Sequence, residues 1–174
     1  MSGRISPGKG AITSLAATPD GMTIYFAAGG TIWSVPAGGT AARKVASGEE
    51  VLWDPSRRGL VIARKESSRL TLWRTTLEGG SEQQIPMDSA APLLELFISP
   101  GTIHPDGRML VSLNLPNSWF NPPALLDMAS GRVTRLLDNG LNDYHSLAWM
   151  PDGQIVATQQ GMRATIWKFT PEGK

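Results

Sequence analysis

Two histidines and a set of recurring aspartates are the residues of this chain whose types suit metal binding or acid–base chemistry. His104 directly precedes a Pro-Asp-Gly turn, and His145 lies two residues after Asp143. One histidine from each of two repeats could converge at a central channel. The simpler interpretation is that His104 is a turn residue and that His145 forms a local hydrogen bond with Asp143. We therefore expect no metal at either residue.

The aspartates of three Pro-Asp-Gly turns, Asp20, Asp106 and Asp152, could form a ring of carboxylates around a cation. They lack the dense series of oxygen ligands that calcium-binding loops use. An Asx turn, in which the carboxylate bonds to the backbone two residues later, accounts for them fully. Cysteine is absent, which excludes disulfides, thiol catalysis and cysteine-based zinc sites. The sequence therefore predicts neither a metal nor a cofactor.

Other catalytic and nucleic-acid signatures are also missing. The chain has no Gly-x-Ser-x-Gly nucleophile elbow, and its Gly-Lys-Gly at 8–10 is too short for a phosphate loop. The formal net charge is only +1. Basic residues such as Arg57, Arg58 and Lys65 flank hairpin tips, and we interpret them as solvated loop residues. We predict that the chain is not an enzyme and does not bind nucleic acid.

The segment at 114–123 is the most suggestive for binding. It carries Trp119 and Phe120 among asparagines and prolines. Aromatic side chains exposed on a loop are typical of protein-contact hot spots. Alternatively, Trp119 packs back over its own repeat as a lid. Both interpretations are open at this point.

A repeated unit must position these residues. Pro-Asp-Gly occurs at 19–21, 105–107 and 151–153, and a degraded copy occurs at 54–59. The starting prolines are 36, 50 and 46 residues apart, and a period near 40 indicates a stack of similar modules. In each copy the turn joins a first strand to a second, apolar strand. A third strand and a glycine-rich turn follow.

The second strands are apolar almost throughout, which is typical of strands covered on both faces. A sandwich would alternate apolar and polar residues, so radial stacking of small sheets fits better. The third strands carry Trp33, Trp73 and Trp167 in one register, with Leu126 at this place in the third copy. We expect these tryptophans to be buried between sheets. The predicted fold class is all-β and β-propeller-type, with about four four-stranded antiparallel blades.

The predicted blades cover about 11–47, 48–92, 93–139 and 140–174, which together form the β-propeller domain at 11–174, after a tail or outer strand at 1–10. Four blades fit an open half-ring of a larger propeller, a small ring, or a ring completed by a homodimer. No secretory signal precedes them, and no stretch approaches the ~20 apolar residues of a membrane span. As written, the chain is expected to be cytoplasmic.

The Pro-Asp-Gly unit with its following Ile-Trp or Leu-Trp resembles the WD40-like (PD40) repeats of TolB-type β-propellers over about 11–173. The segments at 117–123, 126–132 and 143–149 resemble the C-terminal propeller of bacterial receptor-like Ser/Thr protein kinases. There the kinase precedes a membrane span, and the resemblance implies a sensor or protein-binding role for the propeller. The kinase motifs themselves are missing, so kinase chemistry does not carry over.

The resulting hypothesis is a non-catalytic module for protein–protein interaction or ligand sensing. The alternatives are an accessory domain that positions substrate for a hydrolase, and a truncated fragment without independent function. A protein partner is expected, and the compartment is periplasmic or extracellular if the chain belongs to a longer receptor-like protein. The candidate partner-binding residues are Asn117, Trp119, Phe120, Asp143, Tyr144 and His145.

Overall fold

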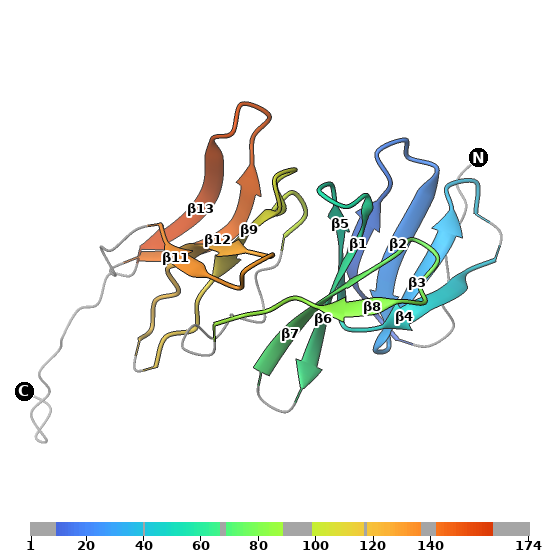
Figure 1. The fold of residues 1–174 in the computed structure, drawn as a ribbon, viewed down its shortest axis with the longest axis horizontal. Helices are drawn as coiled ribbons and strands as arrows, with labels where there is room; N and C mark the ends of the chain where they lie inside the picture. The colour runs from blue at the N-terminus through green and yellow to red at the C-terminus, as the bar shows by residue number, and fades with distance from the viewer. Residues whose placement is uncertain are drawn as a thin grey trace, which may run out of the picture.

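The chain folds as a row of small antiparallel sheets, in a computed structural model that describes residues 10–39, 41–66, 69–88, 99–116, 118–136 and 142–161 (Figure 1). Within these ranges the secondary structure consists of strands and turns, and no helix occurs. The prediction of an all-β fold is therefore confirmed.

The first two sheets are four-stranded meanders, in which strands adjacent in sequence are hydrogen-bonded neighbours. The first sheet consists of β1 (Ile12–Ala17), β2 (Thr23–Ala28), β3 (Thr31–Pro36) and β4 (Arg43–Ser47). The second sheet consists of β5 (Glu50–Asp54), β6 (Gly59–Glu66), β7 (Arg69–Thr75) and β8 (Glu82–Gln84). In both sheets the turn between the first two strands is a copy of the Pro-Asp-Gly unit.

The third and fourth sheets have fewer described strands. The third consists of β9 (Arg108–Ser112), β10 (Pro123–Asp127) and β11 (Val133–Arg135), and the fourth of β12 (Asn142–Trp149) and β13 (Ile155–Gly161). An isolated bridge pairs Ile103 with Met109 beside β9. The third strand predicted for the last repeat, at 165–168 with Trp167, lies outside the described residues, and so does all but the last residue of the predicted tail or outer strand at 1–10.

Two clusters of buried apolar side chains hold the sheets side by side, as in Figure 1. One joins the first sheet to the second through Tyr25, Ile32, Val51, Leu60 and Ile62, among others. The other joins the second sheet to the third through Leu52, Val61, Leu72, Met109, Val111 and Leu126, among others. Burial on both faces, which the continuous apolar runs predict, is confirmed for β2, β6 and β9. For the fourth repeat the prediction is wrong, because β13 is exposed along its whole length, with Ile155 38% and Val156 50% exposed.

The tryptophans of the third strands do not lie at the centres of these seams. Trp33 and Trp73 are half-buried, whereas the preceding residues, Ile32 and Leu72, are fully buried. The Trp73 ring nitrogen donates to Thr71 Oγ1 at 3.1 Å, and the Arg64 guanidinium covers the ring at 4.9 Å. An indole N–H needs a partner when it is buried, so the rim of the seam suits it better than the apolar centre. The expectation that these two indoles are buried is therefore wrong.

The strand pairing is consistent with the predicted register of the third repeat. Trp73 lies opposite Ile62, which packs toward the first sheet, and Leu126 lies opposite Met109, which packs toward the second sheet. Trp73 and Leu126 therefore both lie on the face of their sheet that is turned toward the preceding sheet.

A glycine recurs in the turns that follow β3, β7 and β10. Gly39, Gly79 and Gly131 lie in these turns, with φ values of 60°, 79° and 78°. A Cβ on Gly79 would overlap the carbonyl oxygen of Val45 in the first sheet, and one on Gly131 would lie 2.7 Å from the carbonyl carbon of Pro86. Each turn after a third strand thus rests on the preceding sheet. Gly39 belongs to the first sheet and has no described atom within 4 Å of its Cβ position.

Candidate functional site

The loop between β9 and β10 presents its tryptophan to solvent. Trp119 is 83% exposed, and Phe120 beside it is half-buried. The Ser118 hydroxyl accepts a hydrogen bond from the Phe120 amide at 3.0 Å and donates one to the Phe120 carbonyl at 2.9 Å. These two bonds close a tight turn with Trp119 at its tip. The interpretation of Trp119 as a packed lid is therefore wrong.

The same loop is fixed to the fourth sheet through Asn121. Its backbone amide and its side-chain nitrogen both donate to Asp143 Oδ1, at 2.7 and 2.9 Å. The Leu113 amide donates to the Pro122 carbonyl at 3.0 Å, which closes the base of the loop. The structure therefore brings together the two predicted segments around Trp119 and Asp143, although they are far apart in sequence. Asn117 lies outside the described residues.

Asp143 does not form the expected hydrogen bond with His145. His145 Nε2 lies 4.0 Å from Asp143 Oδ2, which is longer than a hydrogen bond. The Asp143 carboxylate instead accepts the two hydrogen bonds from Asn121, at 2.7 and 2.9 Å. Hydrogen bonds to an ionised carboxylate are shorter and stronger than those between neutral groups. Tyr144 is held from its backbone side, since the Ser112 hydroxyl donates to its carbonyl at 3.3 Å.

A bulge in β12 follows these residues. His145 pairs with Thr158 and Ala148 with Val156, so two residues of β12 oppose one residue of β13. Ser146 takes a φ of 49°, and Leu147 turns into the core while His145 remains half-buried. Bulges redirect side chains in this way and are frequent beside functional sites. The sequence offers no glycine here that would have revealed it.

The other predicted chemistry-bearing residues are explained by the fold. Asp20, Asp106 and Asp152 each accept a 3.0 Å hydrogen bond from the backbone amide two residues later, which confirms the Asx-turn interpretation. His104 lies in its turn with Nδ1 2.9 Å from Asp106 Oδ1. A hydrogen bond from Arg108 holds the pKa of Asp106 well below its ordinary value. Among the described residues, no three histidine or acidic side chains are grouped to hold a metal ion.

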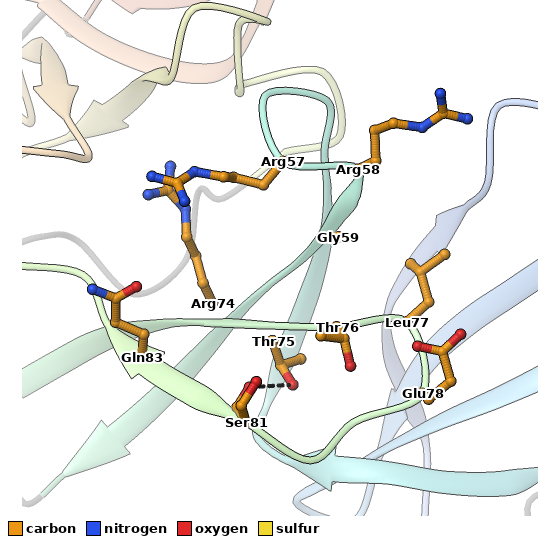
Figure 2. A pocket seen from close by; sticks show the side chains of 10 residues that line it. All are labelled: Arg57, Arg58, Gly59, Arg74, Thr75, Thr76, Leu77, Glu78, Ser81 and Gln83. Carbon is orange, nitrogen blue, oxygen red and sulfur yellow. Dashed lines mark hydrogen bonds between the residues drawn. The ribbon is translucent and has the colours of Figure 1, made fainter.

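A groove lined by arginines lies on the second sheet, and sequence reasoning missed it (Figure 2). It has a volume of about 380 Å³ and lies between the β5–β6 turn and the β7–β8 turn. A smaller cavity of about 120 Å³ adjoins it toward the third sheet. Arg57, Arg74 and Gln83 line both spaces, whereas Arg58 lines only the larger one. Arg57 and Arg74 are 17 residues apart, and only the strand pairing brings them together.

The buried carboxylate of Asp54 fixes Arg74 in this groove. Asp54 is 1% exposed, and Arg74 Nε donates to its Oδ2 at 3.0 Å. The amide and hydroxyl of Ser56 donate to Oδ1 at 3.0 and 2.6 Å. With its carboxylate satisfied in this way, Asp54 holds Arg74 at the mouth of the smaller cavity.

Comparison with solved structures places this arrangement in the class of β-propellers. TolB of Agrobacterium tumefaciens superposes with a TM-score of 0.64 at 18% identity, over 90% of this chain and 61% of that one. Nidogen from a nidogen/laminin complex gives a TM-score of 0.60 at 14% identity, over 86% and 57%. A gluconolactonase of Xanthomonas campestris gives 0.60 at 12% identity, over 91% and 57%. At these identities the likeness shows the fold, and the predicted propeller-type fold class is confirmed.

The chain spans about three fifths of the length of these three structures. No protein-family profile and no curated protein sequence matches it. Within the described ranges, none of the secondary structure is a helix long and apolar enough to cross a membrane.

Proposed function

We propose that this chain is a non-catalytic propeller module that binds a protein partner through the loop at 113–122 and the start of β12. The observation that carries the proposal is the tip of this loop. Trp119 is 83% exposed, yet the backbone beside it is held by Ser118 and by the bonds from Asn121 to Asp143. A large aromatic on a pre-ordered loop binds at low entropic cost, as interface hot spots do.

Two further observations support this proposal. Nidogen has the same fold and was solved in a complex with laminin. The sequence segments around Trp119 and Asp143 also resemble the sensor propellers of receptor-like kinases, and hydrogen bonds from Asn121 to Asp143 connect the two segments. A role as the sensor part of such a receptor is the finer form of the proposal. The fold alone does not distinguish a binding module from an enzyme, because a gluconolactonase shares it.

Site-specific photo-crosslinking tests the proposal with a matched control. A photoreactive residue at Trp119 is compared with one at Met22, which is also exposed, at 66%, but lies on the β1–β2 turn. We expect a discrete cross-linked protein from native lysate at position 119 and none at 22. With that protein purified, Trp119→Ala should weaken binding ~30-fold, the effect of a hot spot of about 2 kcal/mol, and leave the unfolding free energy unchanged. Identical cross-linking at both positions, or equal affinity of Trp119→Ala and wild type, would contradict the proposal.

A further inference from the structure

The arginine groove of the second sheet lies at the opposite end of the sheets from the loop at 113–122 (Figure 1). Figure 2 shows the side chains of Arg57 and Arg74 extending toward the same space, while Arg58 extends in the other direction. Arg57 and Arg74 both line the smaller cavity, together with Gln83. Two guanidinium groups and a side-chain amide therefore reach one confined space.

The charge of Arg57 is not balanced by a described carboxylate. Asp54 compensates Arg74 through the 3.0 Å ion pair. Within the described part of the chain, no carboxylate lies within ion-pair distance of Arg57. Arg57 therefore gives the cavity a net positive charge. An anion in the cavity would balance this charge and could accept further hydrogen bonds from Arg74.

The backbone next to Arg57 is strained. Arg58 takes a φ of 51°, in the left-handed region that costs a non-glycine residue about 1–2 kcal/mol. The other three copies of the turn carry Gly21, Gly107 and Gly153 at a positive φ. The second copy thus retains strain that a glycine would relieve, in the turn that carries Arg57. Strain of this kind is frequent near ligand-binding positions.

The dimensions of the two spaces indicate what the site would bind. The smaller cavity of about 120 Å³ has room for about four water molecules, at ~30 Å³ each, and so for one carboxylate or phosphate group. Guanidinium groups bind both through paired N–H donors. The groove of about 380 Å³ next to it is in the size range of small-molecule sites.

From these observations we propose that Arg57, Arg74 and Gln83 form a binding site for a small anionic ligand. The carboxylate or phosphate group of the ligand lies in the smaller cavity between the two guanidinium groups. The remainder of the ligand lies in the larger groove along the β7–β8 turn. This site is independent of the protein-binding loop proposed above.

The experiment titrates the purified chain with inorganic phosphate and, separately, with glutarate, at constant ionic strength set by sodium chloride. Binding is measured by calorimetry and by the NMR shifts of the arginine Nε–Hε groups. We expect saturable binding of at least one anion, with the largest shifts at Arg57 and Arg74. Saturation by inorganic phosphate identifies the ligand group as a phosphate, and saturation by glutarate identifies it as a carboxylate. No saturable binding of either anion would overturn the proposal.

The variants separate a built site from general electrostatics. Arg57→Ala should weaken binding at least tenfold, and Gln83→Ala should weaken it severalfold. Arg58→Ala removes the same charge one residue away and should change the affinity less than twofold, because Arg58 does not line the smaller cavity. Arg57 and Arg58 are both exposed, so neither change should unfold the chain. Equal losses in Arg57→Ala and Arg58→Ala would refute the site.

Discussion

Gly79→Ala should destabilise the chain more than Gly39→Ala, although the two glycines hold equivalent positions in adjacent sheets. Both have left-handed backbones, with φ values of 79° and 60°. They differ in what surrounds them. A Cβ on Gly79 would overlap the Val45 carbonyl oxygen of the first sheet, whereas no described atom lies within 4 Å of a Cβ on Gly39. The pair therefore isolates the contact between neighbouring sheets.

The magnitude follows from the interactions of the β7–β8 turn. A left-handed alanine costs about 1–2 kcal/mol, of which the lower flexibility of the unfolded chain returns about 0.5–1, so Gly39→Ala should cost about 1 kcal/mol. In Gly79→Ala the turn must also move away from β4. This movement breaks the hydrogen bonds from Tyr25 Oη to the Leu77 carbonyl, at 3.3 Å, and from Arg43 Nη1 to the Glu78 carbonyl, at 3.0 Å. At about 0.5–1.5 kcal/mol for each bond, the expected loss rises to about 2–4 kcal/mol.

Urea unfolding of the two variants and the wild type, followed by tryptophan fluorescence, measures both free energies. The expected result is a Gly79→Ala loss at least twice that of Gly39→Ala, with similar m-values. Equal losses would show that the glycines serve only the local turn. The interpretation that each turn rests on the preceding sheet would then be wrong.

The remaining predictions concern the turns and the two sites. Arg58→Gly should raise the unfolding free energy by up to about 1 kcal/mol in urea denaturation, because glycine relieves the strain at a φ of 51°. The free energy of unfolding should decline as the pH falls below about 4, because the hydrogen bond from Arg108 lowers the pKa of Asp106 in the folded chain, and this contribution is lost as the carboxylate is protonated. Asp106→Asn should make that decline with pH shallower. If the decline below pH 4 is the same in Asp106→Asn and the wild type, Asp106 is not its cause. Trp119→Ala should weaken partner binding and leave anion binding unchanged, and Arg57→Ala should weaken anion binding and leave partner binding unchanged.

Local chemistry explains which parts of the fold could be predicted from the sequence. The aspartates of the repeat bond to the backbone two residues later, and the glycines adopt a positive φ. Both features are encoded within a few residues, so the turns and the strands beside them follow from the pattern. The apolar second strands likewise predict burial on both faces, which the core clusters confirm for β2, β6 and β9 but not for the exposed β13.

Features that depend on strand pairing were not accessible in the same way. Arg57 and Arg74 meet only through the pairing of β6 with β7 and the turn that precedes it. The bulge at Ser146 carries no glycine to mark it.

Departures from the repeat separate the residues that build the fold from those available for binding. Residues that recur among the copies, such as the turn aspartates and the glycines at a positive φ in three of the four turns, have a structural explanation. The second copy replaces its turn with Arg57 and Arg58 and retains the resulting strain. The third copy adds a loop whose tip exposes Trp119. Neither change improves the folding of its own sheet, because strain and exposed aromatic area both cost free energy. The two proposed binding sites lie at these two departures from the repeat.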